Sequence, residues 1–461
     1  MLWLAAYLPA ANYPKNNQGK NLSPKKVLVE SFGSGGQIKM LYDRRQRPQC
    51  VLLDDKLFIV YNGCGTSKTK GPTFPLAIVY DMKTAEFSYP VVLGPASRDH
   101  HYGPVIWADR NKFLHVLFGC HRTPGTHLIS KKPADISDWR IGPQIAPSIS
   151  YPSFHRIFNG QQLIYYRTEG HISSWTYRIS KDNGNTWYGP EQDVTDLDSK
   201  GRTDWASYHT VLPSRDGRFL HVAFIAYDDN RSHDPKRYYN PRYKQQLGDD
   251  EWKYNLYYIK IDLSTGVVMN DKNEVLKTPI DIDYANQHCC IWDTEWRGAG
   301  VPPDIVLDKN GNPAFLHVLS KETIRDHSYY YVRKVGEKWV KTEITHSNHQ
   351  WNSCHIYRDD DGTLHAFLIV GEGYLDTGGE MDQYGGGNIE EWISMDDGNS
   401  WKRYRDLTPF QSEFSGWRYN NIQPVVRPDG SYVKGMLLFY GWKDKDAPKA
   451  RAFLLRELEI K

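Results

Sequence analysis

The sequence predicts an all-β fold, a seven-bladed β-propeller, from three observations. Aromatic residues make up 13% of the 461 residues, and the chain contains 37 glycines and 26 prolines. This composition is typical of many short strands joined by turns. A polar turn followed by a short apolar strand recurs along the chain, typically every 50–70 residues. A period of this size, with several strands in each repeat, is typical of propeller blades.

Seven segments carry the recurring turn and strand. They are VLLDDKLFIVY at 51–61, ADRNKFLHVLFG at 108–119, FNGQQLIYYR at 158–167, SRDGRFLHVAF at 214–224, LDKNGNPAFLHVLS at 307–320, RDDDGTLHAFLIV at 358–370 and RPDGSYVKGMLLFY at 427–440. Each segment predicts part of one blade. Since neither a long amphipathic helix pattern nor a low-complexity linker interrupts them, we expect residues 26–461 to form a single propeller domain.

Two further strings agree with this fold. SKDNGNTW at 180–187 and SMDDGNSW at 394–401 share the pattern S-x-D-x-G-x-T/S-W. The pattern resembles the Asp box, or BNR repeat, of sialidase-like propellers. Its Asp and Gly suit a tight hairpin turn, and its Trp suits packing between strands. The motif predicts structure and implies no chemistry.

The first residues, 1–25, have two interpretations. They begin MLWLAAYLPAAN, which is apolar, ends in small residues and lacks a basic segment. The segment is either the remnant of a signal peptide or a first β-strand. The first interpretation predicts a secreted or periplasmic protein. The six cysteines show no regular disulfide pattern and leave the redox compartment open.

The charge balance excludes some classes of partner. The 57 Lys and Arg residues nearly balance the 55 Asp and Glu residues, for a formal charge of +2. Such a chain has no strong polycationic field, so we expect no nucleic-acid partner. No apolar stretch reaches the roughly 18 residues of a membrane-spanning helix. We therefore expect no membrane partner, and we expect a monomer.

Four residues suit acid–base chemistry on a carboxylate. His101 lies in DHHYGP, His121 in GCH, Tyr151 in YPSFHR and Arg167 in YYR. Two imidazoles, a phenol and a guanidinium together can bind a carboxylate, remove a proton and return one. Other histidines follow Leu at the same place in four repeats, which predicts a structural role for them. These are His115, His221, His317 and His365.

The same strings carry a family resemblance. DHHYGPVIWADRNKFLHVLFGCH, YPSFHRIFNGQQLIYYR and the first Asp box, within 98–187, resemble the propeller ulvan lyases of polysaccharide lyase families 24 and 25, with family 25 closer. The resemblance implies a catalytic set of two His, one Tyr and one Arg. His101 and His121 are 20 residues apart, and Tyr151 and Arg167 are 16 apart, as in that family. His100 is the adjacent rival to His101, and the spacing favours His101.

The resemblance implies a catalytic propeller domain that cleaves ulvan, an anionic sulfated polymer of rhamnose and uronic acid. The expected reaction is β-elimination at the uronic acid, which gives 4,5-unsaturated oligosaccharides. Arg167, assisted by His121, would neutralise the carboxylate, because a guanidinium can bind it bidentately. His101 would act as the base and Tyr151 as the acid, with the reverse open for the other C5 epimer. Catalysis needs no cofactor.

Two further sets of residues are weaker candidates. Arg202, Tyr208 and His209, in GRTDWASYH, are candidates for substrate binding. A structural Zn2+, which the resemblance permits, would take two His and two Cys tetrahedrally. Buried free thiols are the alternative interpretation. The candidate ligands are His288, Cys290, Cys354 and His355, with Cys289 and His349 as substitutes.

Three other functions are compatible with a propeller fold. A sialidase usually has an N-terminal Arg-Ile-Pro string beside its arginine triad, and no such string occurs. A rhamnosidase resembling glycoside hydrolase family 145 would use the same scaffold but hydrolyse its substrate. A non-enzymatic carbohydrate-binding propeller would bind sugar without cleaving it. Formation of a conjugated double bond separates the lyase from both of the last two.

Overall fold

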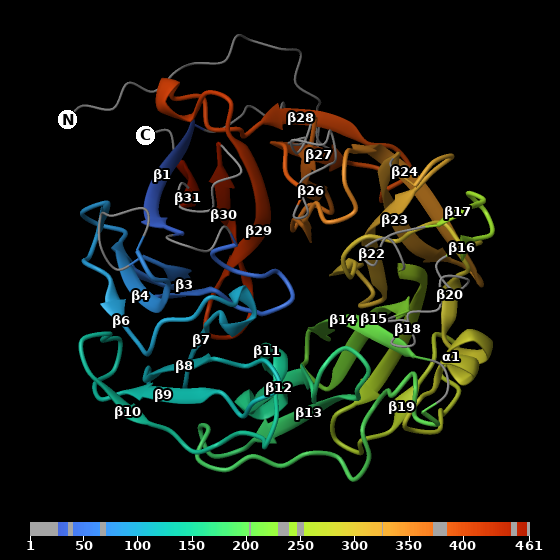
Figure 1. The fold of residues 1–461 in the computed structure, drawn as a ribbon, viewed down its shortest axis with the longest axis horizontal. Coiled ribbons are helices and arrows are strands. Elements are labelled where there is room, and N and C mark those ends of the chain that lie inside the picture. Colours follow the sequence, from blue (N-terminus) through green and yellow to red (C-terminus); the bar gives the residue numbers. More distant parts are fainter. Residues whose placement is uncertain are drawn as a thin grey trace.

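The computed structural model describes residues 26–35, 40–64, 71–201, 204–228, 239–246, 253–324, 326–371, 385–443 and 450–458. The predicted signal remnant at 1–25 lies outside them. The fold is nearly all β, with sheets arranged around a common centre as in a β-propeller (Figure 1). None of the helices in these ranges is long and apolar enough to cross a membrane.

The strands fall into groups of antiparallel neighbours that mostly follow chain order. The first group comprises β2 (Cys50–Leu53), β3 (Lys56–Gly63), β4 (Phe74–Asp81), β5 (Glu86–Phe87) and β6 (Val91–Val92). The second comprises β7 (Val105–Ala108), β8 (Leu114–Phe118), β9 (Thr126–Ser130) and β10 (Trp139–Ile141). The third comprises β11 (Ser150–Arg156), β12 (Gln162–Arg167) and β13 (Trp175–Ser180).

The fourth sheet carries the additional elements. It comprises β14 (Trp205–Pro213), β15 (Phe219–Asp228), β18 (Lys253–Asp262), β19 (Val268–Met269) and β20 (Cys290–Trp292). The short pair β16 (Tyr239–Asn240) and β17 (Gln245–Gln246) precedes β18. The helix α1 (Ile282–His288) leads into β20, at the far side of β18 from β15.

The last sheets complete the ring. One comprises β21 (Asp304–Leu307), β22 (Pro313–Ser320), β23 (His327–Val335) and β24 (Lys338–Ser347). The next comprises β25 (Cys354–Arg358), β26 (Leu364–Val370), β27 (Asn388–Ser394) and β28 (Lys402–Asp406). The final group comprises β29 (Arg418–Val426), β30 (Tyr432–Trp442), β31 (Arg451–Leu458) and β1 (Lys26–Ser34). Short 3₁₀ turns lie at His100–Tyr102, Phe158–Gly160 and Ser412–Phe414.

Strands from the two ends of the described chain close the ring. β1 pairs antiparallel with β31, so the N-terminal strand completes the sheet that β29–β31 begin. That sheet joins the first group through a parallel pairing of Val51 in β2 with Val426 in β29. Closure of this kind leaves fewer open sheet edges, which would otherwise invite pairing with other chains.

The first strand of each group faces the centre. β2 contacts β7, and contacts then follow in turn from β7 to β11, β14, β21, β25, β29 and back to β2. The parallel pairing of β2 with β29 and a parallel bridge between Arg47 and Ser153 give these strands a common direction. Their N-terminal ends therefore meet at one mouth of the centre and their C-terminal ends at the other.

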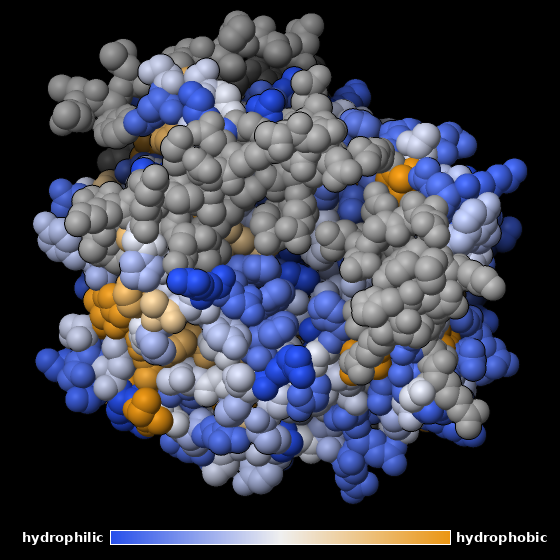
Figure 2. Space-filling model, in the orientation of Figure 1, coloured by the Kyte–Doolittle hydropathy of each residue, from blue (hydrophilic) through white to orange (hydrophobic). Residues whose placement is uncertain are grey.

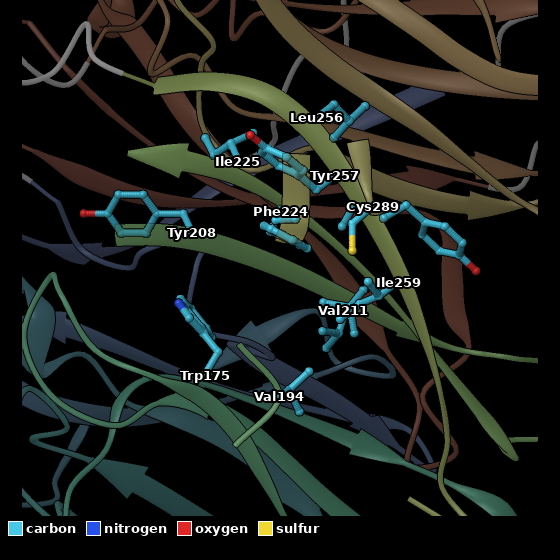
Figure 3. Close-up of a cluster of buried hydrophobic side chains, with 14 of the residues drawn as sticks. Trp175, Val194, Tyr208, Val211, Phe224, Ile225, Leu256, Tyr257, Ile259 and Cys289 are labelled. Carbon is cyan, nitrogen blue, oxygen red and sulfur yellow. The ribbon is translucent and has the colours of Figure 1, made fainter. Parts of the chain in front are cut away.

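Packing between sheets supplies the core. The largest buried cluster lies between the β11–β13 sheet and the β14–β18 sheet and includes Trp175, Phe224 and Tyr257 (Figure 3). Tyr208 lies at the edge of this cluster, and its ring points away from Phe224 (Figure 3). The four histidines that follow Leu in the repeats are all buried, in agreement with a structural role.

The two S-x-D-x-G-x-T/S-W strings form equivalent turns. Asp182 Oδ1 accepts the Thr186 amide at 2.9 Å, and Ser180 Oγ accepts the Gly184 amide at 2.8 Å. Asp396 and Ser394 repeat both bonds in the second string, at 2.9 and 2.8 Å. Gly398 has φ +84°, and a Cβ there would lie 2.2 Å from the Tyr331 ring. The turn therefore requires glycine on two counts.

Candidate active site

The four predicted catalytic residues meet at the mouth formed by the N-terminal ends of the central strands. The rings of His101 and His121 stack with centroids 4.3 Å apart, and the Tyr151 centroid lies 5.7 Å from His101 and 6.1 Å from His121. The Arg167 guanidinium carbon lies 4.7 Å from the Tyr151 centroid. Hydrophilic residues gather near the middle of the face seen in Figure 2.

Asp99 holds His101 in place. Its carboxylate Oδ1 accepts the His101 amide at 3.0 Å and contacts the His101 ring nitrogen Nδ1 at 2.5 Å. Although burial would raise the pKa of Asp99, its bonds to His101 hold that pKa well below its usual range. An ionised Asp99 accepts the Nδ1 proton, which leaves the Nε2 lone pair of His101 available.

Tyr151 has an unusual backbone. Its φ is +54°, in the left-handed region that bulky residues rarely adopt. The pairing of β11 with β12 shifts register between Ser150 and Ser153, and Tyr151 lies in that bulge. The bulge turns the side chain toward the mouth at a backbone cost of about 1–3 kcal/mol. Strain of this kind is concentrated at functional sites.

Burial controls the ionisation of Tyr151 and the two neighbouring histidines. It raises the pKa of Tyr151 well above the ordinary value, and the nearby Arg45 and Arg167 offset only part of this effect. Burial and the adjacent His101 lower the pKa of His121 to about 4 and that of His100 to about 3. Near neutral pH, Tyr151 is therefore a protonated phenol, and His121 and His100 are neutral.

Arg167 is buried, and none of the described residues forms an ion pair with it. Its side chain is fully buried at the end of β12, and none of its three guanidinium nitrogens has a hydrogen-bond partner among the described residues. The rings of Tyr151 and Tyr208 flank it, at 4.7 and 5.5 Å from the guanidinium carbon. The hydroxyl of Tyr151 and Nδ1 of His121 are likewise buried without a partner in these ranges. Unsatisfied buried donors are costly, so such a cluster indicates a ligand.

Sequence reasoning missed a second arginine at the site. Arg45 lies 4.5 Å from the Tyr151 centroid and 5.1 Å from that of Tyr208. Unlike Arg167, it is paired, because the Asp43 carboxylate accepts from its Nε at 2.9 Å and its Nη2 at 2.5 Å. The string YDRRQR contains three arginines, Arg44, Arg45 and Arg47. Neither their spacing nor a sequence pattern indicates which of them faces the site. Asp99, two residues before His101, was missed as well.

The predicted substrate-binding residues separate. Arg202 lies outside the described residues. Tyr208 lies at the site, with its ring 5.7 Å from that of Tyr151. The prediction for His209 is wrong, because neighbouring side chains on a strand point to opposite faces. The ring of His209 stacks on Trp175 at 4.4 Å, and its nitrogens contact Tyr165 Oη and Ser207 Oγ, both at 2.8 Å.

The predicted zinc ligands do not form a set. His288 and Cys290 lie on α1 and β20, at the outer side of β18, whereas Cys354 and His355 lie on the central strand β25 of another sheet. The sequence spacing suggested that the two pairs lie one repeat apart. It could not show that one pair lies at the outer side of its sheet and the other on a central strand. The inner pair also has other partners. Cys354 Sγ accepts from Arg44 at 3.5 Å, and His355 Nδ1 contacts Asp304 at 2.8 Å.

Within the described ranges, one group of His, Cys, Asp and Glu side chains has the proximity of metal ligands. It comprises Asp99, His101 and His121, whose ligand atoms lie within 4.8 Å of one another. The hydrogen bond between Asp99 and Nδ1 of His101 explains why these two side chains lie together. None of the predicted zinc ligands belongs to this group.

We expect the protein to lose stability in mild acid. Burial lowers the pKa of several histidines below the value of about 6.5 for an unfolded chain. The unfolded chain then binds more protons than the folded one, so the free energy of unfolding falls as pH drops from about 6.5 to about 4. The affected residues, with pKa values of about 3 or 4, are His100, His121, His127, His155, His221 and His317.

Urea denaturation at a series of pH values measures this effect. His317→Gln should reduce the loss of unfolding free energy between pH 6.5 and 4, and so flatten its slope against pH. The reduction should be roughly 1.4 kcal/mol for each unit by which burial lowers the pKa of His317 within this window. The exposed Asn310→Gln, which removes no titrating group, is the control and should leave the slope unchanged. A stability that stays constant across this window would contradict the prediction. His365 acts oppositely. Burial would lower its pKa, but Asp359 and Glu391 raise it to about 9, so its contribution is complete below about 6.5 and is lost as pH rises through 9.

Comparisons with known proteins identify a family and similar folds. Residues 76–347 match the family described as BNR repeat-containing family member. The chain belongs to that family. A protein named Ulvan lyase from Nonlabens ulvanivorans is 24% identical over 443 residues, which cover 89% of this chain and 89% of that protein. A second Ulvan lyase, from Alteromonas sp. (strain LOR), is 24% identical and covers 74% of this chain and 72% of its own length.

Solved structures give the same result for the fold of this BNR repeat-containing protein. A polysaccharide lyase PL25 ulvan lyase bound to -[GlcA(1-4)Rha3S]- superposes with a TM-score of 0.70 at 15% identity. The match covers 92% of this chain and 95% of that one. The polysaccharide lyase Uly1 matches with a TM-score of 0.61 at 11% identity, over 98% and 94% of the two chains. The resemblance to ulvan lyases inferred from the sequence is thus confirmed.

Proposed function

We propose that this protein is a polysaccharide lyase that cleaves ulvan by β-elimination at the uronic acid. The products would be oligosaccharides that end in a 4,5-unsaturated uronate. The observation that carries the proposal is the buried guanidinium of Arg167, which has no hydrogen-bond partner among the described residues. The names of the relatives, two of them Ulvan lyase, support the choice of substrate.

Arg167 binds the uronate carboxylate in this proposal. A buried cation without a counter-ion is unstable by several kcal/mol, and a carboxylate that accepts two of its N–H groups removes much of that cost. Nδ1 of His121, also buried without a partner in the described ranges, lies in the same cluster and offers a further contact. The low pKa of His121 keeps it neutral, so it adds no charge. In the tautomer that carries the proton on Nδ1, it donates a hydrogen bond to the carboxylate. Neutralising the carboxylate makes the C5 proton more acidic.

His101 removes the C5 proton. Asp99 accepts from its Nδ1, so Nε2 carries the lone pair that acts as base. Tyr151 then protonates the departing O4. Its raised pKa favours this role over that of a base, since a base would have to be ionised before the reaction. Elimination moves the C5 electron pair into the new C4–C5 double bond as the C4–O4 bond breaks.

We also propose that the sheets are the seven blades of one propeller domain, 26–461. Seven central strands contact one another in a closed cycle, each beginning one group, and this supports the count. β1 belongs to the last blade, together with β29–β31. We propose that the protein acts outside the cytoplasm, because its substrate is a large polymer.

An assay on ulvan, with alginate and heparin in parallel, tests the proposed function. We expect ultraviolet absorbance from a conjugated double bond to rise with ulvan as the chains shorten. New reducing ends without this absorbance would instead indicate hydrolysis, as in the rhamnosidase alternative. Binding without any cleavage would indicate a carbohydrate-binding propeller. Either outcome would overturn the lyase assignment.

Asp99→Asn should lower kcat without unfolding the protein. The amide cannot accept the Nδ1 proton as strongly, so His101 is free to adopt the tautomer that protonates Nε2 and removes the base. We expect kcat to fall by about 10-fold or more with a smaller change in KM. Asp55→Asn, at an exposed carboxyl in the turn between β2 and β3, is the control. Equal kcat values for the two variants would show that Asp99 does not orient the base.

A further inference from the structure

A cavity lies at the opposite mouth from the catalytic residues. It has a volume of about 550 Å³. Residues at the C-terminal ends of central strands line it, among them Ala108 of β7, Arg156 of β11, Val211 of β14 and Val426 of β29. Tyr151, in contrast, lies near the N-terminal end of β11. The cavity is therefore separate from the site described above.

Arginines without carboxylate partners surround this cavity. Arg215 donates to the backbone carbonyls of Lys309 and Asp308 at 3.1 and 2.8 Å, and Arg427 donates to that of Tyr432 at 2.9 Å. Arg156 bonds only to backbone carbonyls too, including that of Pro428 at 3.3 Å. None of these three arginines forms an ion pair in the described part of the chain. Carbonyls satisfy the donors but carry no net negative charge, so these bonds do not neutralise the guanidinium groups.

Two carboxylates also line the cavity, and each forms hydrogen bonds within its own turn. Asp216 accepts from Ser214 Oγ at 2.6 Å and from the Arg218 amide, and thus stabilises its own turn. Asp429 does the same with the amide and hydroxyl of Ser431. Burial and the neighbouring Arg110 lower the pKa of Arg156, while Asp109 and Asp429 raise it. Arg156, Arg215 and Arg427 still outnumber the two lining carboxylates, so the cavity favours a bound anion.

The rest of the lining suits a saccharide. Phe154 and Tyr432 present aromatic rings. Gln423 is 1% exposed, and its Oε1 has no hydrogen-bond partner among the described residues, so it is an acceptor for a hydroxyl group. Mixed aromatic and polar walls and a volume between about 300 and 1,000 Å³ are typical of small-molecule sites.

We propose that this cavity is a second, non-catalytic binding site for a sulfated saccharide, with Arg215 and Arg427 contacting its sulfate group. The sulfate ester supplies the anion that the arginines lack, and the sugar ring lies against the aromatic lining. The choice of a saccharide rests on the proposed function, while the binding of an anion does not. A second site remote from catalysis would hold the polymer to the enzyme between cleavage events.

Isothermal titration calorimetry tests this site. The probe is a size-fractionated ulvan tetrasaccharide, added to the full chain carrying Tyr151→Phe so that cleavage does not interfere. We expect two binding events. Arg215→Ala/Arg427→Ala in the same background should weaken one of them by at least about 10-fold, because two charged hydrogen bonds are lost. Both arginines are exposed, so the fold should tolerate the change.

Three controls make the outcome unambiguous. Lys132→Ala/Arg140→Ala removes two exposed charges elsewhere and should leave both events unchanged. Chemically desulfated tetrasaccharide should lose the second event, and inorganic sulfate should compete with it. Equal binding by the Arg215/Arg427 variant and the Lys132/Arg140 variant would overturn the proposal. So would binding of inorganic sulfate in the cavity with no binding of the tetrasaccharide there.

The failure of this inference is distinguishable from failure of the proposed function. With Tyr151 intact, the Arg215→Ala/Arg427→Ala variant should cleave short ulvan oligosaccharides with an unchanged kcat/KM. If the wild-type protein forms no conjugated double bond, the proposed lyase function is wrong, and the titration still decides the second site. If no second binding event is observed, the proposed second site is wrong and the lyase function stands.

Discussion

Replacing Tyr151 with phenylalanine is expected to lower kcat on ulvan by about 10²–10⁴-fold, the usual contribution of a general acid. The phenol is the one proton donor at the site that burial keeps firmly protonated, since its pKa is raised well above the ordinary value. Without it, O4 leaves as an alkoxide. The rate of formation of the conjugated double bond measures the loss.

The stability of this variant separates a catalytic from a structural role. The hydroxyl of Tyr151 is buried and has no hydrogen-bond partner among the described residues. Its removal should therefore leave the free energy of unfolding unchanged or slightly higher. Tyr208→Phe, on the neighbouring ring 5.7 Å away, is the matched control and should retain much more activity. Full activity of Tyr151→Phe would exclude Tyr151 as the acid.

Replacing Arg167 with methionine is expected to lower kcat/KM by about 10²–10³-fold, as for the loss of a main charge-stabilising group. Methionine fills much of the same volume but cannot bind the carboxylate, so it cannot make the C5 proton more acidic. The guanidinium is buried and unpaired in the described structure, so its removal also removes an uncompensated charge. We therefore expect the variant to be at least as stable as the wild type.

Arg45→Met is the matched comparison for Arg167→Met. Both guanidinium groups lie against Tyr151, at 4.5 and 4.7 Å. Arg45, however, is paired with the buried Asp43, and its loss leaves that carboxylate alone at a cost of about 3–5 kcal/mol. Thermal denaturation should thus show opposite effects for the two variants. A destabilised Arg167→Met with normal kcat/KM would show that Arg167 supports the fold and does not bind the substrate.

Much of the fold could be predicted from local patterns. A turn with Asp and Gly followed by an apolar strand is a short-range signal, and it recurs through the β3, β8 and β26 regions. The closure of the ring was not visible in this way. The pairing of β1 with β31 joins segments from opposite ends of the chain, which no local pattern encodes.

The candidate site divides in the same manner. His101, His121, Tyr151 and Arg167 could be chosen because their residue types and spacings resemble those of a family. Tyr208 and His209 could not be told apart, since strand alternation turns one to the site and the other into a sheet interface.

The sequence by itself determined the propeller-type repeat, the chemical kit of two imidazoles, a phenol and a guanidinium, and the family resemblance. The tertiary structure alone decided the condition of each group. It pairs Arg45 with Asp43 and leaves Arg167 without a partner in the described residues, orients His101 through Asp99, and keeps Tyr151 protonated. It also separates the predicted zinc ligands. The physical reason is that burial and hydrogen-bond partners come from neighbouring blades, and these contacts form only when distant segments pack together.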